Sequence, residues 1–255
     1  MILAPGTILQ RMYLKERLRQ HKPGKFIEVG VGDGSLSYLL CQHGWQGVGF
    51  DLNQQATEKA KQLTKKYIDN NQYQIKNENW LSCKINEPVD LVISSMVLEH
   101  LDTEDEIKYF DNCKAALKPT GKAMLFIPSS MKYWGIEDEI AGHYRRYTKN
   151  YLDILMQKIG WDITTISGLT FPLSNVLYPL SNFLVQRSEQ KKMHLSMKER
   201  TELSGDRNVL FKTSYPKVLK CILNEFILYP FHVLQKFYSR HPDCQVTYLE
   251  CKPKY

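Results

Sequence analysis

The chain has 255 residues, of which 43% are hydrophobic and 24% are charged, and its formal net charge is +7 at pH 7. This composition allows a large buried core, and the length favours one α/β unit with an elaboration over two separate domains. The six cysteines are scattered and form no C-x-x-C pair, which indicates the reduced thiols of a cytosolic protein.

The first 24 residues, MILAPGTILQRMYLKERLRQHKPG, carry basic side chains where a signal peptide needs an apolar core. Their apolar residues recur at helical spacing, which predicts an amphipathic helix that ends before Pro23 and Gly24. The residues expected on its apolar side are Ile8, Leu9, Met12, Leu14 and Leu18.

The next segment, FIEVGVGDGSLSYLL at residues 26–40, places three glycines between an apolar run and a helical pattern. Residues 26–29 predict a buried strand and Ser35 begins a predicted helix, so the glycines occupy the turn between them. Glycine permits positive φ there and lets a ligand approach the main chain, while the free amides of the following helix face that ligand. These features predict a ligand-binding turn.

The spacing of the glycines distinguishes between cofactor classes. Gly30, Gly32 and Gly34 form G-x-G-x-G, in which the third glycine comes one residue earlier than in the dinucleotide motif G-x-G-x-x-G. The Gly-Lys-Ser/Thr ending of a P-loop is absent. Glu28, two residues before Gly30, suits a cationic ligand better than a pyrophosphate.

Strands and helices alternate along the remainder of the chain, which is the pattern of a parallel sheet. The predicted strands after the first are GVGFDLN ending at Asp51, QYQIKN at 72–77, one within 89–101, one within 117–129, 161–171, and CQVTYLECKP near the C-terminus. Helices are predicted over 56–67, over 103–117 and over 148–160. Thr103 and Glu106 have the spacing of a capping box for the second of these helices.

Residues 171–240 are expected to form an insertion before the last strand. From residue 171 to the C-terminus there are 13 Lys and Arg against 7 Asp and Glu, so this part holds +6 of the net charge. Its apolar stretches, FPLSNVLYPLSNFLV and VLKCILNEFILYPFHVLQKFY, are interrupted by prolines or charges before they reach the length of about 20 residues that spans a membrane. A helical lid over a substrate pocket, a dimer surface and an interfacial membrane patch all remain open.

Four motifs occur in the order typical of one enzyme family: EVGVGDG after the first strand, GVGFDLN, VDLVISSMVLEHL and LKPTGKAMLFIPS. The chain therefore resembles the class I S-adenosylmethionine-dependent methyltransferases over about half its length. The resemblance implies an α/β, Rossmann-like, doubly wound sheet of seven strands, with the last strand antiparallel and a helical insertion before it. It also implies S-adenosyl-L-methionine as cofactor and S-adenosyl-L-homocysteine as product. The expected divisions are a core at 1–170, the insertion at 171–240 and the final core strand at 241–255.

The resemblance assigns roles in cofactor binding. It places Asp51 on the ribose hydroxyls, where a carboxylate accepts two hydrogen bonds, and Glu28 near the glycine turn and the methionine ammonium. It lays a residue such as Trp80 along the adenine, although a core position for Trp80 is equally open. The expected cofactor residues are Glu28, Gly30, Gly32, Gly34, Asp51, Leu52, Asn79, Trp80 and Ser95.

The stretch EDEIAGHYRRYT, residues 137–148, is the best candidate for handling the methyl acceptor. It resembles a G-H-x-R-R-Y-T segment found in a bacterial subset of the family. His143 could act as general base, a stronger candidate than His100, and an arginine could bind a carboxylate or phosphate. Alternatively the arginines pair with Glu137, Asp138 or Glu139 and only fix the loop. The expected substrate residues are Tyr133, Trp134, Tyr144, Arg145, Arg146 and Tyr147.

Three classes of function follow from these patterns. The first is methyl transfer to a hydroxyl, amine or carboxyl of a small or lipid-linked metabolite, and the second is a nucleic-acid methyltransferase. The net charge permits the second, but Ser94-Ser95-Met96-Val97 replaces the Asn/Asp-Pro-Pro-aromatic motif of base-amino methylation, so nucleic acid is the weaker partner. The third is a non-catalytic cofactor-binding or membrane-surface protein. We expect no metal site and a cytoplasmic location, with peripheral contact at the inner membrane surface left open.

Overall fold

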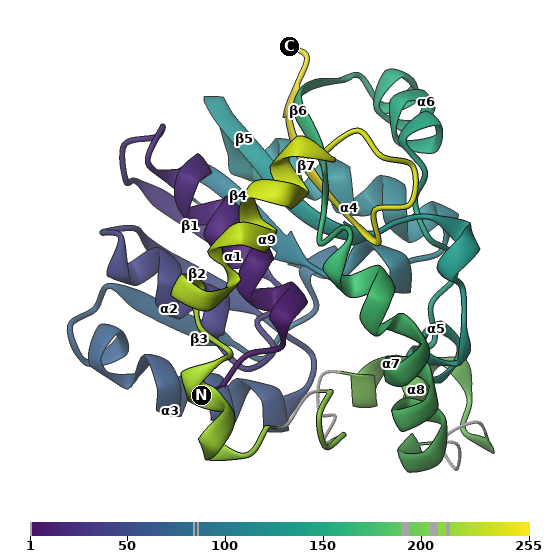
Figure 1. The fold of residues 1–255 in the computed structure, drawn as a ribbon. Helices are drawn as coiled ribbons and strands as arrows, with labels where there is room; N and C mark the ends of the chain where they lie inside the picture. Colours follow the sequence, from purple (N-terminus) through teal and green to yellow (C-terminus); the bar gives the residue numbers. More distant parts are fainter. Residues whose placement is uncertain (1, 84, 86, 190–193, 205–208, 213–214) are drawn as a thin grey trace. The chain divides into compact units, whose positions relative to one another are not determined.

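The computed structural model describes residues 2–83, 85, 87–189, 194–204, 209–212 and 215–255, and a seven-stranded sheet runs through this part of the chain. The strand order is β3-β2-β1-β4-β5-β7-β6 (Figure 1). The strands are β1 (Lys25–Val29), β2 (Gln46–Phe50), β3 (Tyr73–Lys76), β4 (Val89–Ser95), β5 (Leu117–Pro128), β6 (Trp161–Leu169) and β7 (Val246–Pro253). This confirms the predicted α/β, Rossmann-like sheet and the position of its seventh strand near the C-terminus.

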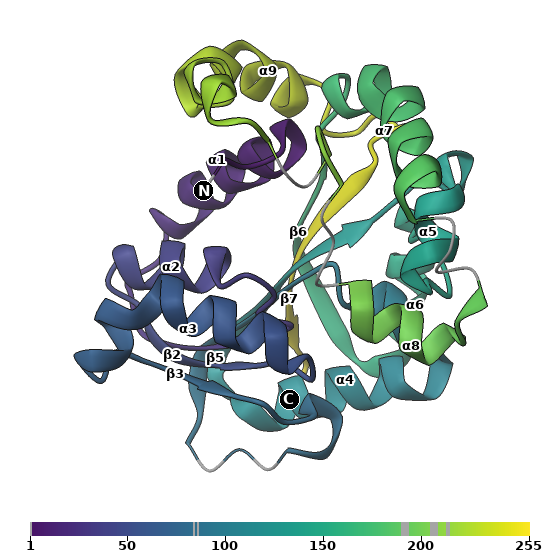
Figure 2. The ribbon, with the colours of Figure 1, turned by 90° about the horizontal axis from the view of Figure 1, so that it is seen from below.

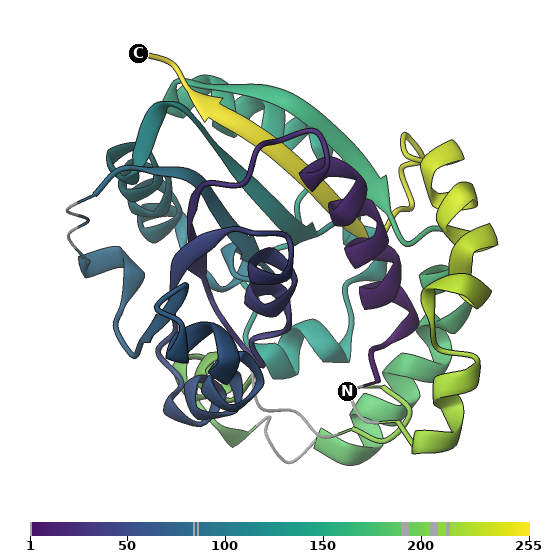
Figure 3. The ribbon, with the colours of Figure 1, turned by 90° about the vertical axis from the view of Figure 1, so that its left-hand side faces the viewer.

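The first five strands are parallel, and β7 runs antiparallel to β6 (Figure 3). The register of β1 aligns Val29 with Phe50 of β2 and with Ser94 of β4. The strand ends that follow these residues therefore lie at one edge of the sheet, where open α/β folds place their ligand sites. Both faces of the central strands are covered, because Leu91, Val92 and Ile93 of β4 are fully buried.

Helices connect most of the strands, as the alternating pattern predicted. They are α1 (Pro5–Leu18), α2 (Ser35–Gln42), α3 (Gln54–Asp69), α4 (Thr103–Ala116), α5 (Ile136–Ala141), α6 (Lys149–Ile159), α7 (Leu173–Glu189), α8 (Met197–Ser204) and α9 (Glu225–Phe237). Short 3-10 turns are η1 (Trp80–Ser82), η2 (Leu98–His100), η3 (Met131–Tyr133) and η5 (Lys217–Cys221). No helix in the part of the chain that the structure describes is long and apolar enough to cross a bilayer.

The chain forms two compact units. The first comprises Met1–His21, Pro128–Thr148 and Ser167–Tyr248, and the second comprises Lys22–Ile127, Lys149–Ile166 and Leu249–Tyr255. The predicted insertion, 171–240, falls within the first unit, where its described residues form α7, α8, η5 and α9. Residues 190–193, 205–208 and 213–214 of that range lie outside the described residues.

In the first unit, α9 lies alongside α1 (Figures 2 and 3). The five apolar residues predicted for one side of the N-terminal helix are all buried. Ile8, Leu9 and Met12 of α1 form a cluster with Leu228 of α9. The N-terminal helix therefore provides the apolar support on which part of the insertion folds.

The cap of α4 differs from the prediction. Asp102, not Thr103, is the N-cap residue, and its carboxylate accepts hydrogen bonds from the backbone N–H groups of Glu104 and Asp105. Thr103 is the first residue of the helix. A carboxylate at this position also interacts favourably with the positive end of the helix dipole, which explains why the aspartate takes the cap.

We expect Asp102→Ala to lower the free energy of unfolding by about 0.5–2 kcal/mol, because two N–H groups of α4 lose their acceptor. Urea unfolding followed by circular dichroism measures this change. Thr103→Ala is the matched control and should cost less than about 0.5 kcal/mol. If Thr103→Ala lowered the free energy of unfolding more than Asp102→Ala, the predicted capping box at Thr103 would be correct.

Candidate active site

The glycine turn after β1 has the backbone geometry that the sequence predicted. Gly30, Gly32 and Gly34 all have positive φ, of 76°, 54° and 78°. A Cβ at Gly30 would lie 2.4 Å from Val97 Cγ2, and one at Gly34 would lie 2.8 Å from the Cα of Ala60. At Gly32 a Cβ would meet no atom within 4 Å, so open space adjoins the turn at this residue. The outer glycines serve close packing, and the middle one leaves its backbone accessible to a ligand.

Asp51, directly after β2, is tied to this turn. One carboxylate oxygen accepts the backbone N–H of Gly32 at 2.9 Å, and the other accepts that of Asn53 at 2.8 Å. A carboxylate offers about four acceptor positions. Two backbone bonds therefore fix its orientation and leave acceptor capacity on both oxygens, which is what a pair of neighbouring hydroxyls requires.

Glu28 lies on β1 immediately before the turn, and its side chain is buried. It is hydrogen-bonded to the hydroxyl of Ser37, which also contacts the Tyr73 hydroxyl. Burial raises the pKa of Glu28 well above its usual range, and the nearby charges of Asp33 and Asp51 raise it further, although the Ser37 bond opposes them. The structure thus places a buried carboxyl with a raised pKa next to the turn, and direct binding of an ammonium by Glu28 stays a prediction.

The residues expected near the adenine occupy different environments. Trp80 is buried against Phe50, and its Nε1 has no hydrogen-bond partner among the described residues. Asn79 caps η1 by accepting the backbone N–H of Leu81 at 3.0 Å. These contacts suit a core role for Trp80, while Leu52 is exposed and Ser95 is half-buried at the end of β4. Contact of these four residues with the cofactor remains a prediction.

The segment predicted to handle the acceptor belongs to the first unit and contains α5. Helix α5 ends at Gly142, whose φ of 70° turns the chain back. This turn brings His143 Nδ1 to 2.8 Å from Oδ1 of the fully buried Asp138. Arg146 Nε donates to the same oxygen at 2.8 Å, and the backbone N–H of Gly135 donates to Oδ2 at 3.0 Å.

Asp138 remains ionised in this network. Burial alone would raise its pKa, but the hydrogen bonds from His143 and Arg146 and their charges outweigh burial and hold the pKa below its usual value. Because Asp138 is an acceptor, it fixes the tautomer of a neutral His143 with the proton on Nδ1 and the lone pair on Nε2. From the sequence we expect Asp138 only as an ion-pair partner of an arginine. Its role in orienting His143 is not predicted.

Some arginines and aromatic residues of this segment are buried or held by hydrogen bonds, and others are exposed or half-buried. Arg146 is held by Asp138 and donates to the backbone oxygen of Ser129 at 3.2 Å, as the alternative reading of the sequence proposed for this residue. Tyr147 is fully buried. Tyr144 is exposed, and Trp134 and Arg145 are half-buried. Substrate contact by any of these residues is untested by the structure and stays a prediction.

Tyr133 is anchored by α7, which the sequence did not reveal. Its hydroxyl accepts a bond from Asn175 at 2.7 Å, and its backbone oxygen accepts one from the Tyr178 hydroxyl at 2.9 Å. Contacts between residues so far apart in the sequence do not follow from local patterns. Asn175 and Tyr178 lie in an apolar stretch whose pattern does not predict contact with Tyr133.

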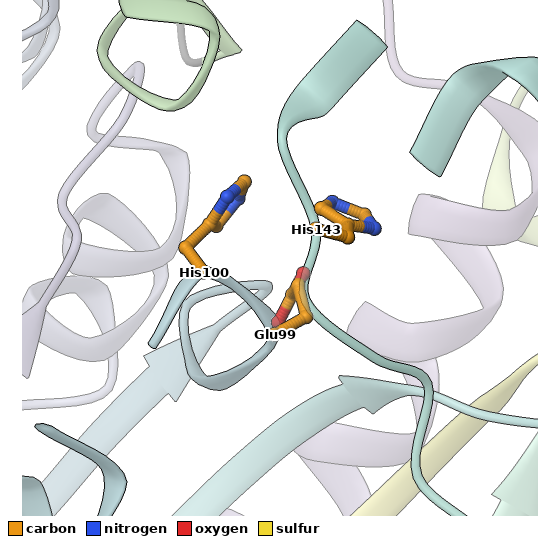
Figure 4. A group of neighbouring side chains, drawn as sticks. All are labelled: Glu99, His100 and His143. Atoms are coloured by element: carbon orange, nitrogen blue, oxygen red, sulfur yellow. The ribbon is translucent and has the colours of Figure 1, made fainter. Parts of the chain in front are cut away.

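Figure 4 shows the three ionisable side chains considered for chemistry. Glu99 and His100 lie on η2, directly after β4, and His143 lies on the segment that follows α5. Glu99 is fully buried. His143 has the buried Asp138 carboxylate at its Nδ1. It therefore remains the stronger candidate for a base.

Comparison with known proteins identifies the family of the chain. A family model described as a methyltransferase domain matches residues 6–166, and the chain belongs to that family. A ubiquinone biosynthesis O-methyltransferase from Coxiella burnetii is 31% identical over 96 residues, which is 38% of this chain and 40% of the relative. An uncharacterized methyltransferase from Alkaliphilus oremlandii is 24% identical over 110 residues, 43% of this chain and 48% of the relative. The chain thus spans less than half the length of these two curated relatives.

Solved structures share the fold at low identity. The N-methyltransferase NodS from Bradyrhizobium japonicum, in complex with S-adenosyl-L-homocysteine, gives a TM-score of 0.55 at 18% identity and covers 66% of this chain and 81% of its own. The glycopeptide N-methyltransferase MtfA gives 0.52 at 12% identity, over 65% of this chain and 83% of its own. The chain accordingly carries a methyltransferase domain and shares its fold with these solved N-methyltransferases.

We expect Glu28→Gln to flatten the dependence of stability on pH. A carboxyl whose pKa is raised by folding contributes its full stability below the unfolded value of about 4.3, and the contribution is lost as pH rises through the folded value. The amide cannot ionise, so the variant should gain stability relative to the natural protein as pH rises toward neutral. Urea unfolding across this range measures the effect, with Glu58→Gln on the exposed surface of α3 as control. Parallel profiles for Glu28→Gln and the natural protein would mean that folding does not shift the pKa of Glu28.

Proposed function

We propose that the protein transfers a methyl group from S-adenosylmethionine to a hydroxyl, amine or carboxyl of a small or lipid-linked metabolite. The observation that carries the proposal is the buried Asp138 carboxylate bonded to His143, since it equips a methyltransferase with an oriented base. The resemblance to a bacterial subset with the G-H-x-R-R-Y-T segment belongs to the same proposal. Production of S-adenosyl-L-homocysteine with a panel of sugar, lipid and polyketide-like acceptors tests it.

The residues present fit the cofactor on chemical grounds. S-adenosylmethionine carries its methyl group on a positively charged sulfur, so displacement of the sulfonium needs a nucleophile but no metal. Asp51 would accept the ribose hydroxyls with the capacity that its two backbone bonds leave. The open space at Gly32 would admit the ligand to the main chain. We assign Glu28, Gly30, Gly34, Leu52, Asn79, Trp80 and Ser95 to the surroundings of the same ligand.

His143 would act on the acceptor. Its Nε2 would take the proton of a hydroxyl or ammonium as the acceptor atom forms its bond to the methyl carbon and the carbon–sulfur bond breaks. The imidazolium that results would be stabilised by the Asp138 carboxylate at Nδ1, 2.8 Å away. Tyr133, Trp134, Tyr144, Arg145, Arg146 and Tyr147 are assigned to acceptor binding or its support.

The other two classes of function are weaker. The Coxiella burnetii relative is described as a ubiquinone biosynthesis O-methyltransferase and one structural neighbour as a glycopeptide N-methyltransferase, which favours a metabolite over nucleic acid. At the end of β4, Ser94 Oγ accepts a bond from the buried Tyr109 hydroxyl at 2.9 Å. This serine therefore has a packing role where a base-amino methyltransferase carries its motif. A non-catalytic binding protein would bind the cofactor and give no turnover with any acceptor.

We expect Asp51→Ala to weaken binding of S-adenosylmethionine by about 1.5–3 kcal/mol, the range for hydrogen bonds to a charged group. Isothermal titration calorimetry measures it. Asp69→Ala, an exposed aspartate at the end of α3, is the control and should bind as the natural protein does. Equal affinity in the Asp51 variant would remove this residue from the site.

We expect His143→Ala to reduce turnover about 10²–10⁴-fold, the usual contribution of a general base, with little change in cofactor affinity. Asp138→Asn should lower kcat more than it changes the KM for the acceptor, because the amide supplies no charge for the imidazolium. Thermal unfolding of each variant separates this effect from loss of the fold. His194→Ala, an exposed histidine of the same unit, is the matched control. Unchanged turnover in His143→Ala would mean that this side chain supports the structure of the segment and does not act as a base.

A further inference from the structure

Helix α9 exposes a stripe of large apolar side chains, although it also buries Leu228 against α1. Its buried positions are Leu228, His232 and Gln235. The opposite side, at spacings of three and four residues, carries Phe226, Tyr229, Val233 and Phe237, all of them exposed. Phe226 is 86% exposed and Phe237 is 80% exposed. A surface helix normally buries such a stripe against the core.

Hydrogen bonds to α1 and to the start of α7 hold α9 in this orientation. His232 Nε2 lies 2.8 Å from a carboxylate oxygen of Glu16, and Gln235 Nε2 donates to the backbone oxygen of Leu9 at 3.0 Å. Gln235 Oε1 also accepts the backbone N–H of Thr170 at 3.0 Å. Rotating the helix to bury its aromatic side would break all three bonds. The outward aromatic side is therefore a consequence of specific pairing.

Helix α7 also exposes apolar side chains. Asn175 and Tyr178 point inward to Tyr133, through the bonds described above. Val176, Leu180 and Phe183 recur on another side at spacings of four and three, and all three are exposed, Val176 to 76%. Figures 2 and 3 show α7 and α9 on the same side of the first unit. Phe171, just before α7, contacts both Tyr238 and His241 just after α9, which joins the two helices.

Cations flank this apolar surface. Lys217 and Lys220 lie on η5, immediately before α9, and Arg240 lies just after it; all three are exposed, and no acidic partner is found for them among the described residues. The acidic groups nearby are already paired, Glu225 with Lys15 and Glu16 with Lys236. Val218, between the two lysines, is 74% exposed. Basic and apolar side chains thus alternate on η5.

We propose that the exposed sides of α7, η5 and α9 form a docking surface for an anionic lipid bilayer. Aromatic and aliphatic side chains of an interfacial helix enter the region between headgroups and acyl chains, and neighbouring lysines and arginines bind anionic headgroups. In a symmetric dimer through this surface, the three unpaired cations of one copy would face those of the other, so a second copy of the chain is the poorer occupant. The surface determines where the protein resides and is independent of the reaction proposed above.

Co-sedimentation with vesicles tests the proposal without any methyl acceptor. The full chain should sediment with vesicles of phosphatidylcholine and phosphatidylglycerol, sediment less with phosphatidylcholine alone, and lose binding as salt rises. Phe226→Ser combined with Phe237→Ser should weaken partition at least about tenfold, because two apolar side chains leave the membrane. Lys217→Gln combined with Lys220→Gln should weaken it about fivefold for each charge removed, the factor that corresponds to about 1 kcal/mol.

The matched control is Ile154→Ser on α6, a 58% exposed apolar side chain outside this surface, which should bind vesicles as the natural protein does. Circular dichroism and thermal unfolding show whether each variant is folded. The proposal would be overturned if the natural protein sedimented with neither kind of vesicle. It would also be overturned if Ile154→Ser weakened vesicle binding as much as the phenylalanine substitutions do. Light scattering that shows a dimer dissociated by the phenylalanine substitutions would assign the surface to a second copy instead.

Discussion

Burial of ionisable groups constrains both segments that we connect with function. A carboxyl group removed from water must either take up a proton or gather cations and hydrogen-bond donors. Glu28 lies among hydroxyls and other acids, and its pKa is raised. Asp138 lies between His143 and Arg146, and its pKa is lowered. The first arrangement favours the protonated form of a carboxyl beside the glycine turn, whereas the second favours a negative charge at the imidazole, where a base needs it.

The two units are stabilised by different means. In the second unit, fully buried apolar strands such as β4 supply the core, and the glycine turn and Asp51 are positioned by backbone register and backbone hydrogen bonds. In the first unit, α7 and α9 are oriented by side-chain hydrogen bonds and direct apolar side chains outward. The apolar contact of Leu228 with α1 and the polar pairs of α7 and α9 together fix which side of each helix meets solvent or a partner.

The sequence predicted those features that depend on local chemistry. The glycine turn, Asp51 at a strand end and the apolar side of α1 follow from spacing within a few residues, and the structure agrees with each. The orientation of α9 could not be predicted, because Phe226, Tyr229, Val233 and Phe237 have the spacing of a buried stripe and the deciding bonds come from residues more than 200 positions away. The pairing of Asp138 with His143 depends on the left-handed turn at Gly142, which the sequence pattern does not predict. The start of α4 was predicted one residue too late, so that Thr103 was expected as the cap in place of Asp102.

The Asp138–His143 pair also bears on the nature of the acceptor. A hydroxyl or an ammonium must lose a proton to become a nucleophile, so an oriented imidazole lowers the barrier for both. A carboxylate is already ionised near neutral pH and gains nothing from a base. If the acceptor were a carboxylate, nothing in the chemistry would require a buried, charged aspartate whose desolvation costs free energy. On this ground we propose a hydroxyl or amine acceptor over a carboxylate.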